Sequence, residues 1–380
     1  MLLDYETLRL IWWVLLGVLL IGFAATDGFD LGVAALLPFA AKGDTERRIA
    51  INTVGPVWEG NQVWLVLGGG AIFAAWPQLY AISFSGFYLA MFVTLVALIL
   101  RPVAFKFRSK REDPKWRQRW DIALFIGGFV PALIFGVAIG NVLQGVPFHL
   151  DDTLRPFYTG TFFGLLNPFG LLCGLTSVAL LLMHGGVWLA FKADGPVGER
   201  GRLYGMIMAV ATIVLFALGG VAIAMFIDGF NYVNAVDTNG PSNPLINPVE
   251  RVEGGWLANY AAYPWLMAAP IMGFAGAALT LLALLIRKAG PALITSFVSI
   301  FGVISTVGVS MFPMILPSST MPNASLGVWD SSSSHLTLFI MLIVTVIFLP
   351  IVLAYTAWAY KILWGKVTAE YVNDSQGPAY

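Results

Sequence analysis

The chain has 380 residues, of which 58% are hydrophobic and 11% are charged, and its formal net charge at pH 7 is zero. An ordinary soluble domain carries about 25% charged residues, so this composition excludes a soluble globular protein and predicts an integral membrane protein. Nucleic acid is excluded as a partner, because duplex binding needs many basic contacts to phosphate. The single cysteine, Cys173, excludes a disulfide framework and a cysteine-based metal site.

Apolar segments about 20 residues long, the length that crosses a membrane core of ~30 Å, recur along the whole chain. They cover residues 9–36, 49–72, 79–100, 122–143, 163–191, 205–227, 263–286, 292–313 and 335–360. The ten-residue alternation of a membrane barrel does not occur. The first span has no basic leader and is too long for a cleaved signal peptide. We therefore predict an all-α integral membrane helical bundle of nine transmembrane helices.

The spacing of these segments predicts one membrane domain over residues 1–380. Four spans, a connection, four more spans and a last helix suit two four-helix bundles and one peripheral helix. The first bundle would cover residues 1–145, the second 155–315, and the ninth helix 335–360.

Loop charge predicts the orientation, because Lys and Arg accumulate on the cytoplasmic side of a membrane. With nine spans, only Arg9, Arg155 and Arg251 of the 21 basic residues fall on one side. The remainder, including the basic tract from Arg101 to Arg119, fall on the other side, where they would anchor the chain at anionic head groups. The N-terminus is thus expected outside and the C-terminus in the cytoplasm.

Two outside loops, over residues 228–262 and 314–334, are long and rich in turn residues. Trp256 and Trp329 lie in them, and Trp76 follows the second span. Because tryptophan concentrates at membrane interfaces, we expect these three side chains to be interfacial anchors.

Three carboxylates occur where lipid disfavours them: Asp27 and Asp30 near the end of the first span, and Glu59 inside the second. An acid at mid-bilayer costs about 3 kcal/mol, so such groups persist mainly where they face a protein interior or a proton route. Asp27 and Asp30 are three residues apart and share a helix face. Burial and like charge both favour the protonated carboxyl, which suits groups that pass protons near neutral pH.

The surroundings of Glu59 are unusually polar for a membrane helix, with Trp58 before it and Asn61 and Gln62 after it. Glu59 follows Arg48 by about 16 Å of helical rise, which predicts a position near the middle of the second span and close to the other two acids. Pro56 and Gly60 allow a kink there. Two other readings stay open: a Mg²⁺ or Ca²⁺ site, for which a fourth acid is missing, and hydrogen bonding between helices without transport.

The three histidines decide whether the chain could ligate haem alone. His149 lies in an outside loop, His335 begins the ninth span, and His184 is the one intramembrane candidate. No pair has the spacing of haem ligands, so the isolated chain is predicted to bind no haem. Arg101 closes an apolar span, where its guanidinium could pair with a buried carboxylate or a haem propionate.

Several short motifs occur in a fixed order along the chain. In the first half they are Asp4-Tyr5-Glu6, Ile11-Trp12-Trp13, Thr26-Asp27-Gly28-Phe29-Asp30, Glu46-Arg47-Arg48, Trp58-Glu59-Gly60-Asn61-Gln62-Val63-Trp64, Phe84-Ser85-Gly86-Phe87-Tyr88 and Gln144-Gly145-Val146-Pro147-Phe148. In the second half they are Asn167-Pro168-Phe169, Ser242-Asn243-Pro244-Leu245, Met311-Phe312-Pro313 and Leu316-Pro317-Ser318-Ser319. Together these motifs resemble subunit II of cytochrome bd-type ubiquinol oxidases, and the resemblance spans nearly the whole chain in collinear order.

This resemblance implies a multi-pass subunit of a bacterial inner-membrane complex that oxidises quinol and reduces O2 to water. It also implies nine spans. Two haems b and one haem d would be held by a larger subunit I, and this subunit would be haem-free but carry a bound quinone, here taken as ubiquinone. Small single-span accessory subunits are further expected partners, beside quinol, O2 and the lipid bilayer.

The resemblance also implies roles for individual residues. Asp27, Asp30 and Glu59 would deliver protons from the cytoplasm with Trp58 alongside, and oxygen would reach the complex beside Trp64. Some relatives have Asp where this chain has Glu59. Contact of Arg101 or Arg9 with a haem propionate stays open, and no catalytic residue or metal ligand is expected in this chain.

Two other classes fit the sequence without the resemblance. A proton-coupled secondary transporter would use midplane acids to bind its coupling ion. A purely structural scaffold subunit is compatible with every predicted helix.

Overall fold

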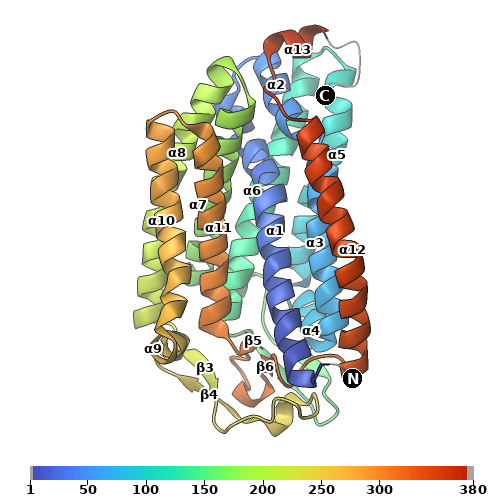
Figure 1. The fold of residues 1–380 in the computed structure, drawn as a ribbon, viewed down its shortest axis with the longest axis vertical. Coiled ribbons are helices and arrows are strands. Elements are labelled where there is room, and N and C mark those ends of the chain that lie inside the picture. Colours follow the sequence, from blue (N-terminus) through green and yellow to red (C-terminus); the bar gives the residue numbers. More distant parts are fainter. Residues whose placement is uncertain (1–2, 375–380) are drawn as a thin grey trace.

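The computed structural model describes residues 3–374 of the chain. Long helices run side by side along the longest axis of the molecule, and short hairpins gather at the end where the chain begins (Figure 1). Eight helical segments of the described chain are long and apolar enough to cross a membrane, judged by length and composition. The structure therefore is that of a multi-pass helical membrane protein.

The helices of ten or more residues are α1 (Tyr5–Ala40), α2 (Asp44–Val54), α3 (Trp58–Ala75), α4 (Pro77–Gly86), α5 (Tyr88–Phe107), α6 (Pro114–Gln144), α7 (Pro168–Lys192), α8 (Gly195–Met225), α10 (Ala268–Leu285), α11 (Ala289–Met311) and α12 (His335–Ile362). The shorter helices are α9 (Ala258–Ala262) and α13 (Ala369–Asp374), with 3-10 turns η1 (Arg108–Lys110), η2 (Phe163–Leu166), η3 (Pro244–Ile246), η4 (Gly255–Leu257), η5 (Pro264–Met267) and η6 (Pro322–Ala324).

The second predicted span differs from expectation, because it is divided into α2 and α3 rather than continuous over residues 49–72. Pro56 lies in the break, where it can neither donate a backbone hydrogen bond nor continue the preceding helix. The polar residues that open α3 also lower its apolar character, and this segment is absent from the eight apolar helices. The third predicted span, over residues 79–100, is likewise divided: α4 covers its first part and ends at Gly86, and α5 begins at Tyr88.

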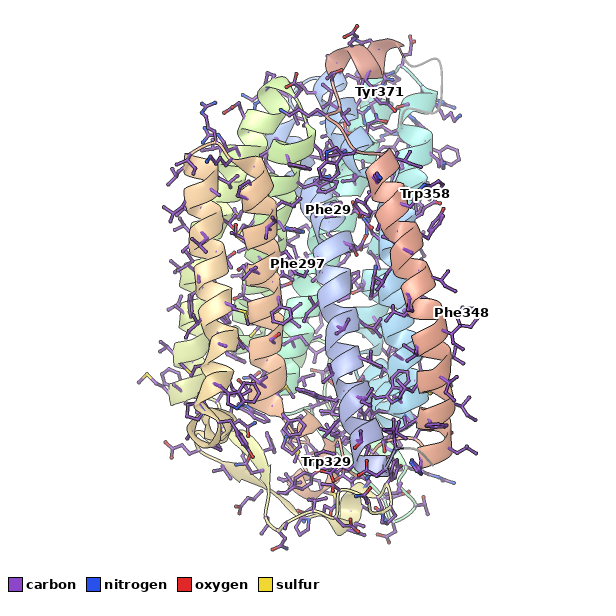
Figure 2. All side chains as sticks on the ribbon, in the orientation of Figure 1. Phe29, Phe297, Trp329, Phe348, Trp358 and Tyr371 are labelled. Atoms are coloured by element: carbon purple, nitrogen blue, oxygen red, sulfur yellow. The ribbon has the colours of Figure 1, made fainter. Side chains whose placement is uncertain are left out.

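Contacts between helices place α1 at the centre. It packs on α3 and α6 of the first half and on α7 and α11 of the second half. In the second half, α7 packs on α8, α8 on α10, α10 on α11, and α11 back on α7. The last long helix, α12, touches α1 and α3 but is exposed along most of its length. Figure 2 shows Phe29 of α1 inside the molecule, whereas Phe348 and Trp358 of α12 point outward.

Three two-stranded antiparallel sheets close the end that carries the N-terminus. They pair β1 (Phe148–Leu150) with β2 (Pro156–Tyr158), β3 (Gly229–Tyr232) with β4 (Val249–Val252), and β5 (Met314–Leu316) with β6 (Leu326–Gly327).

The tryptophans of this end are buried, so the prediction that they are interfacial anchors is wrong. Trp76 and Trp256 are each 1% exposed and Trp329 is 8% exposed. The indole of Trp256 donates to the Leu143 carbonyl at 3.0 Å, and Trp329 packs edge-on against Phe312. The hairpins cover these rings and give them a protein core instead of a lipid boundary.

The opposite end is held by ion pairs between segments far apart in sequence. Arg108 binds Asp121 at 2.6 Å and Asp44 at 3.0 Å, which ties η1 to α6 and to the start of α2. Arg200 of α8 pairs with Glu46 of α2 at 2.7 Å. Part of the basic tract from Arg101 to Arg119 is thereby used to join helices, beyond the lipid anchoring predicted for it.

Candidate functional site

A buried ion pair lies between α1 and α5. Two nitrogens of the Arg101 guanidinium donate to the two carboxylate oxygens of Asp27, at 2.7 and 3.0 Å. Both side chains are fully buried. Planar two-point contacts of this kind are the strongest form of Arg–carboxylate pairing. Of the two partners left open for Arg101, the structure places a carboxylate against it.

Asp30 lies one turn further along α1 and is also buried, at 1% exposure. One of its oxygens accepts a hydrogen bond from the Asn61 amide at 2.8 Å. The oxygen of that amide accepts from the Tyr360 hydroxyl at 2.6 Å. A chain of three polar side chains thus connects α1, α3 and α12 through the interior of the molecule.

The start of α3 places two of the expected residues on this inner face. Trp58 and Asn61 are three residues apart, so both point to the same side of the helix, and both are buried. The Trp58 ring packs on Phe105 of α5, with ring centroids 5.4 Å apart. The break before α3 therefore directs its first turn toward the Asp27–Arg101 pair.

Glu59 does not join the other two acids as the sequence suggested. It is exposed and lies roughly 200° around the helix from Asn61, because successive residues are ~100° apart. It lies in the first turn of α3, directly after the break. The Glu59 side chain therefore lies on the outer side of α3, where no other part of the described chain covers it.

Trp64 is part of the contact between α1 and α3. Its side chain is 8% exposed, and a methyl group on Gly22 would lie 2.8 Å from its ring. The ring thus fills the space that the missing side chain of Gly22 leaves on α1.

Within residues 3–374, Arg9 forms no ion pair with a carboxylate, and its contact with a haem propionate stays a prediction. It lies about 27 Å along α1 from Asp27, and its side chain is fully buried under the loops over residues 228–262 and 314–334. Its nitrogens donate to the Ser332 hydroxyl at 2.8 Å and to the Thr238 and Gly240 carbonyls at 2.6 and 3.1 Å. Neutral oxygens therefore satisfy this guanidinium, which fastens two loops to α1.

The histidines are engaged in other contacts. Both ring nitrogens of His184 have partners: the Ser296 hydroxyl at 2.8 Å and the Ala25 carbonyl at 3.0 Å. His335 contacts the Leu3 carbonyl at 2.9 Å, and His149 stacks on Phe157. Within residues 3–374, no group of three His, Cys, Asp or Glu side chains could hold a metal ion.

Three buried polar atoms at this site have no hydrogen-bond partner among the described residues. They are the second carboxylate oxygen of Asp30, the indole nitrogen of Trp58 and the Nε of Arg101. Buried polar groups in native proteins are nearly always satisfied, so these atoms mark places where a polar molecule can bind. One acceptor and two donors in this arrangement suit water or a carbonyl compound.

Asp30 is the group best placed for proton chemistry. Asp27 is neutralised by Arg101, whereas Asp30 makes no ion pair within the described part of the chain. A carboxyl without a counter-charge can take up and release a proton. Tyr360 could not be connected with this site from sequence, because it lies 299 residues from Asn61. The unusual polarity of Trp58 to Gln62 did indicate that α3 contributes.

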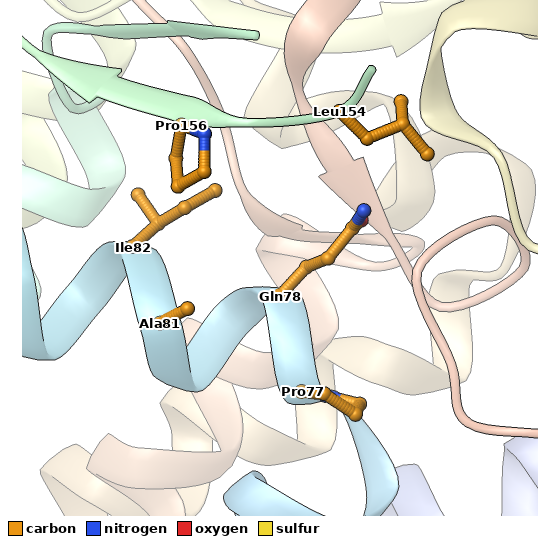
Figure 3. A pocket seen from close by; sticks show the side chains of 6 residues that line it. All are labelled: Pro77, Gln78, Ala81, Ile82, Leu154 and Pro156. Atoms are coloured by element: carbon orange, nitrogen blue, oxygen red, sulfur yellow. The ribbon is translucent and has the colours of Figure 1, made fainter.

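A cavity of about 270 Å³ lies at the other end of the molecule, between α4 and β2 (Figure 3). Its walls are Pro77, Gln78, Ala81, Ile82, Leu154 and Pro156. None of these side chains is ionisable, so this cavity offers no proton or metal chemistry.

Comparisons with known proteins give a consistent result. The family described as cytochrome bd terminal oxidase subunit II matches residues 8–363. Subunit 2 of cytochrome bd-I ubiquinol oxidase from Escherichia coli strain K12 is 49% identical over 377 residues, 99% of this chain and 100% of the relative. A probable cytochrome oxidase subunit 2 from Haemophilus influenzae is 48% identical over the same shares. Cytochrome bd ubiquinol oxidase subunit 2 from Bacillus subtilis is 29% identical over 94% of this chain and 96% of the relative.

Among solved structures, the bd oxidase from Geobacillus thermodenitrificans contains a similar chain. The TM-score is 0.70 and the sequence identity 16%, with 94% of this chain and 98% of that chain covered. At this identity the similarity is one of fold.

Proposed function

The chain belongs to the cytochrome bd terminal oxidase subunit II family, and we propose that it supports a haem-bearing subunit I and carries part of the proton supply for oxygen reduction. It is a multi-pass membrane subunit of a quinol oxidase complex whose partner is subunit I and whose cofactors include haem. Because the chain belongs to this family, the alternative hypothesis of an independent proton-coupled secondary transporter is rejected.

The nine-span topology is part of this proposal, with α2 and α3 together forming the second, broken span. The start of α1 and the short helix α13 lie at opposite ends of the molecule (Figure 1), as an odd number of crossings between them requires. Basic residues from three segments meet at the end that carries the C-terminus, where Arg47, Arg108 and Arg200 form ion pairs. The bias toward cytoplasmic Lys and Arg therefore favours an N-terminus outside and a C-terminus in the cytoplasm.

Two haems b and one haem d are assigned to subunit I, because the residues here do not suit haem ligation. His184 already uses both ring nitrogens, and His335 and His149 lie near the opposite end beside other rings. The chain is accordingly a haem-free subunit, and no step of the oxygen chemistry is placed on it.

Asp30 carries the proposal for proton supply. We place the proton route past two carboxyl groups: Glu59 on the outer side of α3, and Asp30 of α1, which faces the inner side of α3. The Trp58 ring lies alongside, between α3 and α5. The free oxygen of Asp30 and the indole nitrogen of Trp58 support a hydrated connection. Asp27 has an indirect role. Its ion pair with Arg101 fixes the electrostatic environment of the Asp30 carboxyl, which lies one helical turn away.

Further assignments follow from the family. Oxygen reaches the complex beside Trp64, and the indole nitrogen of Trp58 is a donor that suits a carbonyl oxygen of bound ubiquinone. The ring of contacts among α7, α8, α10 and α11 supports a second four-helix bundle over residues 155–315, beside a first over 1–145 and a ninth helix over 335–360. The complex belongs to the bacterial inner membrane, oxidises quinol and reduces O2, and small single-span subunits accompany it.

The proton route is tested by oxygen consumption with excess quinol on complexes matched for haem content. Asp30→Asn removes the ionisable group at nearly constant shape. Because a positioned acid contributes roughly 10²- to 10⁴-fold to a proton-transfer step, turnover should fall at least 10²-fold if that step limits the rate. Asp30→Glu should retain more activity, and Glu59→Gln should also slow turnover.

Glu253→Gln serves as the matched control, because Glu253 is exposed on the opposite end of the molecule. Its complex should turn over like the wild type. An Asp30→Asn complex with wild-type turnover would make this carboxyl a packing element, and a wild-type rate for Glu59→Gln alone would remove only Glu59 from the route.

A further inference from the structure

A second cavity, of about 310 Å³, lies at the end of the molecule that carries the C-terminus. It is bounded by the break between α2 and α3, by the end of α7 and by the chain that follows α12. Its volume is at the lower end of the range for ligand pockets, about 300–1,000 Å³. Tyr371, which lines it, appears at this end in Figure 2.

The charge of the cavity is one-sided. Two lysines, Lys192 and Lys366, line it, and no acidic residue does. Lys366 makes only a long contact of 3.7 Å with Asp194, and both side chains are more than half exposed. Exposed pairs of this kind contribute little, so Lys366 remains available to an anion, and both charged side chains of the lining are cationic.

Lys192 is the more informative of the two lysines, because it is 8% exposed. Its ammonium donates to the Leu363 carbonyl at 2.7 Å and makes no ion pair within residues 3–374. An ammonium has three donors, so capping the end of α12 uses only part of its capacity. A buried charge without a counter-ion is costly, and an anion in the cavity would supply one.

The start of α3 also favours an anion. Val57, which lines the cavity, is the N-cap of α3 and provides no side-chain cap. Backbone N–H groups at a helix N-terminus carry partial positive charge and favour anions.

The remaining walls fit the boundary between lipid head groups and acyl chains. Trp188, Phe191 and Trp364 line the cavity, and the Phe191 and Trp364 rings pack edge-on with centroids 5.3 Å apart. Aromatic rings concentrate at this level of a membrane, and clusters of Lys and Arg beside membrane helices attract anionic lipids.

We propose that this cavity binds the phosphate of an anionic phospholipid from the cytoplasmic leaflet, with Lys192 and Lys366 as its cationic contacts and the aromatic walls beside the glycerol. The bound lipid would hold together the α2–α3 break, α7 and the chain after α12. The cavity shares Tyr360 with the hydrogen-bond chain that leads to Asp30, but its two lysines take no part in the proposed proton route. Lipid retention and turnover therefore test the two proposals independently.

The test is native mass spectrometry of the purified complex with its partner subunit, after equilibration with phosphatidylglycerol, with phosphatidylcholine, or with phosphatidylglycerol plus inorganic phosphate. We expect wild type to retain phosphatidylglycerol in preference to phosphatidylcholine. Each of Lys192→Gln and Lys366→Gln should weaken retention about fivefold. Lys192→Gln also removes the hydrogen bond to the Leu363 carbonyl and could prevent folding. Lys366 is exposed, so Lys366→Gln should fold and keeps the test valid in that case.

Lys361→Gln is the matched control: Lys361 is exposed at the end of α12 but does not line the cavity, and its complex should retain lipid like the wild type. Unchanged retention in Lys192→Gln and Lys366→Gln, or an equal loss in Lys361→Gln, would overturn the site. Displacement of the lipid by inorganic phosphate would show that the cavity binds the free ion, and it would overturn the proposal that a lipid headgroup occupies it.

Discussion

Asp27 and Arg101 are fully buried, so each depends on the other for its charge to be tolerated. Removal of one partner from a buried ion pair leaves an uncompensated charge and typically costs 3–5 kcal/mol. We therefore predict that Asp27→Asn lowers the free energy of unfolding of the complex by about 3–5 kcal/mol. The change in free energy is measured by thermal or denaturant unfolding of the complex, with dissociation of the subunits as the signal.

A double variant that carries both Asp27→Leu and Arg101→Met provides the comparison, because it removes both charges and leaves apolar side chains. Replacing a whole buried ion pair with apolar residues is often neutral or stabilising, so the double variant should be more stable than Asp27→Asn. A single variant as stable as wild type would mean that the guanidinium has another counter-charge in the complex.

Glu46 gives a pH-dependent prediction at the end with the ion-pair network. Hydrogen bonds from the Arg200 guanidinium lower the pKa of Glu46 from 4.5 to about 2. Because the folded pKa is depressed, this stabilisation is complete above pH 4.5 and disappears as the pH falls toward 2. Glu46→Gln should thus lower the unfolding temperature at pH 7, with a difference from wild type that shrinks below pH 4.5.

The unfolding temperatures of wild type and Glu46→Gln complexes would be measured at a series of pH values. Glu253→Gln, at an exposed site on the other end, should show no such change. A difference that stays constant from pH 7 to pH 3 would contradict the assignment to this ion pair.

Sequence reasoning identified the buried acids but not all of their contacts. The positions of Asp27 and Asp30 followed from three-residue helical spacing, which depends only on the local backbone. The partner of Asn61, Tyr360, comes from the last long helix, and nothing local to either residue indicates that contact. Glu59 was expected to point toward the other two acids, but a new helix begins after the break at Pro56, and on that helix Glu59 is exposed.

At the scale of elements, α1 and α7 approach so closely that only glycine fits between them. A methyl group on Gly185 would lie 2.5 Å from the carbonyl carbon of Gly32, closer than real contacts allow. Small residues permit such close helix packing in membranes. Gly185→Ala should force the helices apart and lower stability by about 1–3 kcal/mol, as overpacking of cores does.

Gly219→Ala in α8 is the matched control, because a methyl group there would meet no atom within 4 Å. The unfolding temperature of its complex should equal or exceed that of wild type, since alanine favours helix over glycine. Equal stability of the Gly185→Ala and Gly219→Ala complexes would show that α1 and α7 can separate without cost.

The helical class and most helix positions could be predicted because ~20 apolar residues in succession have few other solutions in a membrane. The hairpins could not, and with them the burial of Trp76 and Trp256. An aromatic residue beside a span has the same local signature whether lipid or a folded loop covers it, and here three hairpins do.

For the whole molecule, the fold persists where sequence similarity is low. At 16% identity, the Geobacillus thermodenitrificans structure still superposes with a TM-score of 0.70. The described residues combine a neutralised pair, Asp27 and Arg101, with the carboxyl of Asp30, which makes no ion pair among them. On this combination rests our proposal that the chain supplies protons and structural support to a partner that holds the haem.

The most direct test of this division of labour is the haem content of the chain purified alone and together with subunit I. We predict that the isolated chain is colourless and that the pair carries haem and consumes oxygen with quinol. His184→Ala should leave the haem content of the pair unchanged. Stoichiometric haem on the isolated chain, lost in the His184→Ala variant, would contradict the account.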